Sequence, residues 1–580
     1  MLNALKHMLK VFCLTGGVFI ASTFGFASTE LSETIEQSGL SGSFLASRIA
    51  ISDQDDEAAM QFLERAVALD PEDAKLKQDL FVALVANGQI DEAVKVIRGI
   101  EHNAANRNLV GFVFAAQELR KRSWNAVSGA LKEVAGVDLD KTLREITLAW
   151  GLAGQRKYED AFTKLDSLAG PEWVKVLKNY HHGLIAQMDG RDDVAEQKFQ
   201  AVVDNRAVIA VLTETYIRAI EALVRNRSKV GEIEKAKSSL AYGLQLLPDH
   251  APFKQMEEVL DSEQVLKPIL TTPSEGVAEI FYNVASAIQR DGNTNTVAKT
   301  YLQLSSYLAP EADVVTIGLA ELYLRQGSYE KSNLYYERIP DTSPFYRISQ
   351  LEKASNLARL ERKDEAIETL NTLVDENPVD LSGYMALGSI YSRDKQYREA
   401  ADIFDKAVNQ IGEPQTYHWN LFFRRGIAYE RLKEWEKAEP NFKQSLSLSA
   451  NQPEVLNYLG YSWIDQGVHL DEGMDMIRKA VDLRPRSGFI VDSLGWAYYR
   501  LGRYEEAVEE LERAVTLMPQ DPTINDHLGD AYWKVGRKLE ATFQWKIALA
   551  AKTPPEYPEK IERKLDVGLM DDEENSAKTE

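Results

Sequence analysis

The order of apolar and polar residues predicts helices along almost the whole chain. From residue 40 to about residue 550, apolar residues recur three and four positions apart, the spacing that collects them on one face of an α-helix. In the C-terminal half the pattern itself recurs. Five glycines mark one repeat position, at intervals of 38, 34, 35 and 34 residues: Gly388, Gly426, Gly460, Gly495 and Gly529. This regularity predicts a series of similar helix pairs.

Other positions of the repeat show how such pairs pack. An aromatic residue follows each glycine by three positions: Tyr391, Tyr429, Trp463, Tyr498 and Tyr532. A small residue follows the glycine by 12 or 13 positions: Ala400, Ala438, Gly473, Ala507 and Ala541. Another small residue lies seven positions further: Ala407, Ser445, Ala480, Ala514 and Ala548. Small residues let two helices cross closely, and the large ones fill the space between pairs. One pair cannot bury its apolar face alone, so the pairs must stack.

The pattern resembles the tetratricopeptide repeat, a helix–turn–helix unit of 34 residues. The resemblance implies an all-α fold, a right-handed α-solenoid or superhelix of such repeats. The segments 457–463, 492–499 and 525–533 look similar to exported tetratricopeptide proteins of proteobacterial type. That resemblance implies a fold and a location, and no established activity.

The repeat pattern also predicts how the chain is divided. Residues 40–261 form a degenerate N-terminal array, and residues 277–552 form the C-terminal array. Prolines and small polar residues interrupt the helical period at 262–276, which predicts a hinge or linker. An amphipathic segment at 553–570 is expected to cap the last repeat. Two segments are expected to be flexible, 28–39 and the acidic tail 571–580.

The N-terminus has the features of a secretory signal peptide. Lys6 and Lys10 precede an apolar stretch, and small residues precede a cleavage site after about Ala27. The alternative is an uncleaved membrane anchor, but the apolar stretch is short and diluted for a span. We expect residues 1–27 to be removed and the protein to be periplasmic, with no stable membrane span after cleavage.

Composition narrows the possible functions. The net charge is −22, whereas a general nucleic-acid binder needs a basic surface. Cleavage would remove two basic residues and make the charge −24. Cleavage would also remove Cys13. Because Cys13 is the only cysteine of the sequence, an intramolecular disulfide is excluded.

No catalytic or cofactor motif is found in the sequence. Metalloprotease, phosphate-loop and serine-hydrolase signatures are missing, so we expect no enzyme activity, no cofactor and no metal site. The neighbouring His181 and His182 point about 100° apart on a helix, which makes them poor joint ligands.

The resemblance predicts a partner-binding groove, because the first helix of each tetratricopeptide unit lines the concave surface. With the repeated glycine as position 8, positions 2, 5, 9 and 12 face the groove. These positions hold an aromatic and acidic set of side chains: Phe423, Asn457, Tyr461, Phe489, Asp492, Trp496, Tyr499, Asp526, Asp530 and Trp533. The carboxylates stand where a carboxylate clamp would have basic residues, so a basic or extended protein segment is the expected partner.

The main hypothesis is therefore a periplasmic scaffold or adaptor that binds protein partners and supports a cell-envelope complex. The first alternative is a carbohydrate-binding accessory of polysaccharide export, because aromatic and acidic side chains also suit sugars. An enzyme is the second alternative.

Overall fold

A computed structural model of the chain describes residue 35 and residues 38–100, 106–136, 138–289, 295–551 and 557–569. Every regular element in these ranges is a helix, so the predicted all-α repeat fold is confirmed. The chain divides into two compact units, Met1–Arg362 and Lys363–Glu580.

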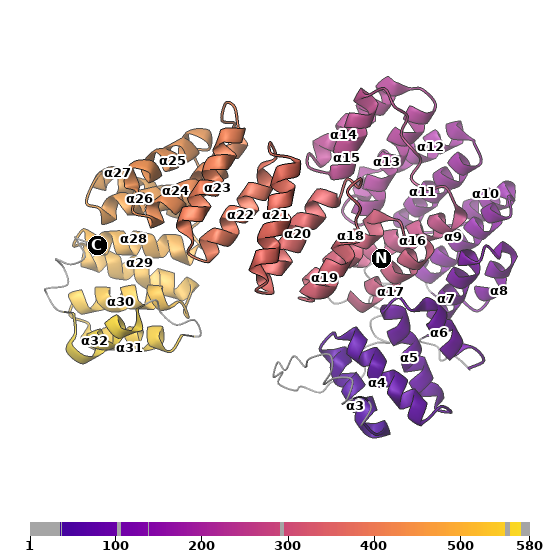
Figure 1. The fold of residues 1–580 in the computed structure, drawn as a ribbon, viewed down its shortest axis with the longest axis horizontal. Coiled ribbons are helices and arrows are strands. Elements are labelled where there is room, and N and C mark those ends of the chain that lie inside the picture. Colours follow the sequence, from indigo (N-terminus) through magenta and orange to yellow (C-terminus); the bar gives the residue numbers. More distant parts are fainter. Residues whose placement is uncertain are drawn as a thin grey trace. The chain divides into compact units, whose positions relative to one another are not determined.

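The first unit is built from α-helices (Figure 1). The helices are α3 (Leu40–Ser52), α4 (Asp56–Leu69), α5 (Ala74–Ala86), α6 (Ile90–Ile97), α7 (Arg107–Arg120), α8 (Val127–Ala130), α9 (Asp138–Gly154), α10 (Tyr158–Asp166), α11 (Glu172–Met188), α12 (Asp192–Val203), α13 (Thr213–Lys229), α14 (Ile233–Leu246), α15 (Ala251–Asp261), α16 (Pro273–Gln289), α17 (Asn295–Leu308), α18 (Asp313–Arg325), α19 (Tyr329–Tyr336) and α20 (Tyr346–Arg359). Two 3₁₀ helices accompany them, η1 (Trp124–Ala126) and η2 (Arg206–Val208).

The second unit contains five complete helix pairs, preceded by one helix and followed by another. Its helices are α21 (Lys363–Glu376), α22 (Leu381–Arg393), α23 (Tyr397–Gln410), α24 (Trp419–Arg431), α25 (Trp435–Leu448), α26 (Pro453–Asp465), α27 (Leu470–Leu483), α28 (Gly488–Arg500), α29 (Tyr504–Leu517), α30 (Pro522–Lys534), α31 (Lys538–Leu549) and α32 (Pro558–Val567), with η3 (Thr416–His418) before α24.

The repeated glycines are where the two helices of a pair approach most closely. A Cβ atom at Gly388 would lie 2.3 Å from the ring of Phe404, and one at Gly529 would lie 2.4 Å from the indole of Trp545. A large side chain of the second helix thus packs directly on the backbone of the first. The small residues expected in the second helices are all buried. The pattern therefore identified the helix–helix contacts correctly.

In the first unit, two helices, α16 and α17, pack against the first helices of the preceding repeats. Helix α16 contacts α7, α9, α11 and α13, and α17 contacts α5 and α7 (Figure 1). Helix α16 is buried on all its faces from Gly276 to Ala285, as expected of a helix that is surrounded by others. A Cβ atom at Gly276 would lie 2.3 Å from the Trp150 ring of α9, so only glycine allows this approach.

The segment 262–276 differs from its predicted role as the border between two arrays. Residues 262–272 contain no helix, so the prolines do interrupt the helical pattern. The helices on both sides of this break nevertheless belong to one hydrophobic core, and the first unit continues to Arg362. The physical reason is the packing of α16 against α9 and α13, which joins the two sides.

The predicted signal peptide, residues 1–27, and the predicted tail, residues 571–580, lie outside the described residues. None of the helices in the described ranges combines the length and the apolar character needed to cross a bilayer.

Candidate functional site

Helices α22, α24, α26, α28 and α30 are the first helices of the repeats in the second unit. We call the surface that they share the groove face. Contacts join α26 to α28 and α28 to α30, and the predicted residues differ in exposure. Phe489 is 59% exposed, whereas Asp492 and Asp530 are buried. The other seven are half-buried: Phe423, Asn457, Tyr461, Trp496, Tyr499, Asp526 and Trp533.

A stack of rings lies at the centre of the groove face. The rings of Trp496 and Tyr499, one helical turn apart on α28, stack with centroids 4.5 Å apart. Trp496 also stacks on the imidazole of His527 from α30, with ring centroids 3.9 Å apart. His527 Nδ1 lies 2.9 Å from Asp492 Oδ1. Burial alone would lower the pKa of His527, but the neighbouring carboxylates, led by Asp492, raise it above its usual value.

The other two predicted carboxylates are engaged by a lysine of α32. Lys564 Nζ lies 2.9 Å from Asp526 Oδ1 and 2.8 Å from Asp530 Oδ2. Asp530 also accepts a hydrogen bond of 2.9 Å from Trp545 Nε1. Burial raises the pKa of Asp530 to about 6, against the opposing influence of Lys564. The carboxylates that the sequence placed in the groove thus already have basic partners in the same unit.

Trp533 packs within the end of the unit instead of standing free on the groove face. Its ring lies against the backbone of Gly568, where a Cβ atom would come within 2.0 Å of it, and its centroid is 5.4 Å from that of Trp545. Lys538 lies over the same ring at 4.9 Å. Phe489 and Trp496 are therefore better placed than Trp533 to meet a partner.

Polar contacts link successive first helices across the groove face. Asn457 Nδ2 of α26 donates to Ser493 Oγ of α28 at 3.0 Å. Arg500 Nη1 of α28 lies 3.4 Å from Asp465 Oδ1 of α26. Prediction from the repeat register missed His527 and Lys564. His527 had a detectable signal, because it falls one register position after Asp526 and 35 residues after Asp492, one repeat along.

The corresponding surface of the first unit is covered by α16 and held by buried charges. Glu279 of α16 accepts a 2.8 Å hydrogen bond from the Tyr180 hydroxyl of α11, and its other oxygen pairs with Arg218 of α13 at 2.9 Å. Arg218 also pairs with Glu221 at 2.7 Å, and Glu221 lies 3.1 Å from His250 Nε2. Burial would raise the pKa of Glu279, but the Arg218 guanidinium and the Tyr180 hydroxyl hold it below its usual value.

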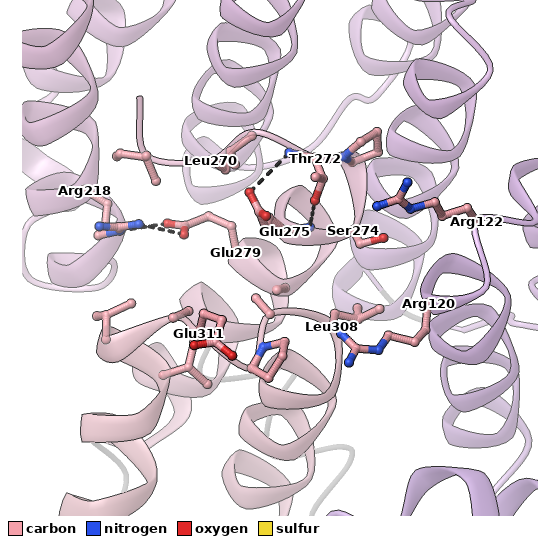
Figure 2. Close-up of a pocket in the computed structure, with 18 of the residues that line it drawn as sticks. Arg120, Arg122, Arg218, Leu270, Thr272, Ser274, Glu275, Glu279, Leu308 and Glu311 are labelled. Carbon is pink, nitrogen blue, oxygen red and sulfur yellow. Dashed lines mark hydrogen bonds and ion pairs between the residues drawn. The ribbon is translucent and has the colours of Figure 1, made fainter. Parts of the chain in front are cut away.

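A cavity of about 720 Å³ lies beside this network in the first unit. Figure 2 shows Glu279 facing Arg218, with Arg120 and Arg122 of the α7 end on the other side of the space. The backbone N–H of Thr271 at the start of α16 already donates to Glu275, at 2.6 Å. Because the wall carries both charges, the cavity favours neither an anion nor a cation. Among the described residues, no group of three His, Cys, Asp or Glu side chains is placed to hold a metal ion.

Comparison with known families matches three parts of the chain. A TPR repeat family model matches residues 495–536, and two tetratricopeptide repeat models match residues 50–110 and 351–415. These matches lie in both units, on helix pairs whose packing has the geometry described above. The chain is a tetratricopeptide-repeat protein.

Two curated relatives show how far the sequence likeness reaches. A TPR repeat-containing protein of Pseudomonas aeruginosa is 26% identical over 160 residues, which are 27% of this chain and 26% of that protein. A protein O-mannosyl-transferase of Homo sapiens is 25% identical over 173 residues, 30% of this chain and 20% of that protein. The repeat protein thus spans about a quarter or less of the length of these relatives.

Solved structures resemble the repeat protein at lower identity. A tetratricopeptide repeat protein from Parabacteroides merdae aligns at 15% identity and a TM-score of 0.37, over 44% of this chain and 97% of that one. The APC/C hetero-tetramer Cut9–Hcn1 aligns at 12% identity and a TM-score of 0.38, over 94% of this chain and 99% of that one.

Proposed function

We propose that this repeat protein is an exported scaffold of the cell envelope whose second unit binds a protein partner on its groove face. Tetratricopeptide repeats generally bind protein or peptide partners. One observation carries the choice of surface. On the groove face the exposed ring of Phe489 lies seven positions, about two helical turns, before the stacked Trp496 on the same helix, whereas the first helices of the first unit are covered by α16.

Aromatic contact, more than charge, would supply the affinity. Rigid aromatic side chains give a large contact area for little lost conformational freedom, and they dominate many interfaces. A basic segment remains part of the proposal, but it would have to compete with Lys564 for Asp526 and with His527 for Asp492. We therefore expect an extended segment with apolar or aromatic side chains, and only a weak preference for basic ones.

Crosslinking in the intact cell envelope tests the proposed surface. The wild-type chain is compared with a double variant, Phe489→Ala with Trp496→Ala. The matched control is Glu505→Ala with Glu509→Ala, on the exposed side of α29. We expect specific proteins to be captured by the wild type and the control, and lost from the groove-face variant. If no protein is captured and the purified chain is retained on polysaccharide, the carbohydrate-binding alternative replaces the scaffold.

Export is tested independently by the N-terminus of the protein in the cell. Mass spectrometry of the chain from the periplasmic fraction should find a terminus close to Ser28. A full-length chain confined to the cytoplasmic fraction would contradict the proposed location while leaving the groove-face proposal open to its own test.

A further inference from the structure

Helix α31, the second helix of the last repeat, has an apolar stripe on the side away from the core. Ala541, Trp545 and Ala548 face inward and are buried. On the opposite side, Leu539, Phe543 and Ile547 are 69%, 57% and 43% exposed. These three residues are four positions apart, so they lie in one row along the helix. No element in the described ranges covers the row, although α32 packs against the same helix.

The other repeats show that this row is not a feature of the fold. At the same register positions α29 has Glu505, Glu509 and Arg513, and α23 has Arg398, Asp402 and Lys406. These side chains are exposed or half-buried, as expected of a helix side that faces water. Among the five complete repeats of the second unit, the last one alone has three large apolar residues in this row. An apolar row at a position that is elsewhere charged indicates a surface that a partner covers.

The charges beside the row indicate what that partner is. Glu540 lies three positions before Phe543 and Lys546 lies three positions after it, so they flank the row on opposite sides. Suppose that two copies of α31 pack side by side in the same direction, related by a two-fold axis along the helices. Glu540 of each copy then lies on the same side of the contact as Lys546 of the other. In an antiparallel pair, Glu540 would instead face Glu540, and Lys546 would face Lys546.

We propose that two copies of this chain associate through α31, packed in parallel across the row of Leu539, Phe543 and Ile547. The surface is then self-complementary, as a two-fold interface requires. Phe543 is the central anchor, and two Glu540–Lys546 pairs, one on each side, set the direction. Glu540 Oε1 also lies 3.1 Å from Nε of Arg537, the residue just before α31, and this contact orients the carboxylate without removing it from the surface. Such a dimer would carry two groove faces and bind a repeated or clustered partner more tightly than one chain.

The test measures the mass of the purified full chain in solution by light scattering and sedimentation. We expect a dimer for the wild type, and a dissociation constant raised at least about 30-fold by Phe543→Glu, as for a central aromatic anchor. Glu509→Lys on α29 is the matched control and should remain dimeric. Because both positions face solvent in the single chain, each variant should keep the helical circular dichroism of the wild type.

A charge exchange tests the direction of packing. Glu540→Lys alone should weaken the dimer, and Glu540→Lys with Lys546→Glu should restore it. A wild-type chain that is monomeric at its highest soluble concentration would overturn the proposal, as would a dimer unaffected by Phe543→Glu. A dimer that depends on Phe543 but is not restored by the exchange would overturn the parallel arrangement.

Discussion

Replacing Glu279 by Gln tests whether buried charges hold α16 against the first helices of the first unit. The Glu279 side chain is 7% exposed and pairs with Arg218, which is itself 12% exposed. Glutamine keeps the shape and can still accept the hydrogen bond from Tyr180. It leaves Arg218 with one carboxylate, Glu221, in place of two. Removing one partner of a buried ion pair typically costs about 3–5 kcal/mol, because the other charge stays buried without full compensation.

We therefore expect Glu279→Gln to lower the free energy of unfolding of the first unit by about 3 kcal/mol or more. Chemical denaturation gives the total effect, and hydrogen exchange at the amides of α16 assigns it to this helix. Glu257→Gln is the matched control, since it removes the same charge from an exposed position of α15. The control should change stability by less than about 0.5 kcal/mol.

A second variant separates the ion pair from simple loss of packing. Adding Arg218→Met and Glu221→Gln to the Glu279→Gln variant removes both charges that would otherwise stay buried without a full partner, and should recover part of the lost stability. A loss below about 1 kcal/mol for Glu279→Gln would refute the reasoning, because it would mean that Glu221 and solvent satisfy Arg218. A triple variant less stable than Glu279→Gln alone would show that the Arg218–Glu221 pair stabilises the unit independently of Glu279.

Three further outcomes follow from the geometry. Gly276→Ala places a methyl group against the Trp150 ring and should cost about 1–3 kcal/mol of first-unit stability, measured by denaturation, with no effect on the second unit. The raised pKa of His527 stabilises the second unit fully below pH 6.5 and progressively less as pH rises through the folded-state pKa. Melting temperatures from pH 6 to pH 8 should therefore fall more for the wild type than for His527→Gln, and parallel curves would contradict the pairing with Asp492. Gly568→Ala forces a side chain into a backbone conformation with φ of 77° and should expose α32 to proteolysis at a cost of about 1–3 kcal/mol.

The repeat register predicted the helix pairs well because the packing between two neighbouring helices determines which residues recur in the sequence. Gly388 and Gly529 are glycine because a ring from the next helix lies on their backbone, and this relation is visible in the spacing alone. The same register places Trp496 and Asp492 on one face of one helix, and both residues lie on α28. What it could not give is the partner of each side chain, because the partner comes from another helix at a distance that only the fold sets.

The acidity of the groove shows this limit most clearly. The register places Asp526 and Asp530 on the inner helix and predicts that their carboxylates favour a basic partner segment. Lys564, which lies 34 positions after Asp530, comes from a helix outside the repeat pattern and approaches both. No periodicity in the five repeats contains this information. The register therefore gives the position of a charged side chain. Whether that charge is available to a partner depends on contacts with other helices, which the register does not contain.

The two units carry the same repeat yet use their first helices differently, and the difference can be traced to α16. Residues 273–289 contain only two charged residues, Glu275 and Glu279, and the helix they form is buried on all faces. A helix that is apolar all round must be enclosed, so it requires other helices around it. The first helices of the first unit provide that enclosure, so their inner surface is covered by α16.

The second unit has no comparable helix in its described residues: α32 is short and charged, and it covers only the end near Trp533. The face with Phe489 exposed is therefore left uncovered because the second unit has no uncharged helix to lie on it, and this is why we propose the second unit as the partner-binding one.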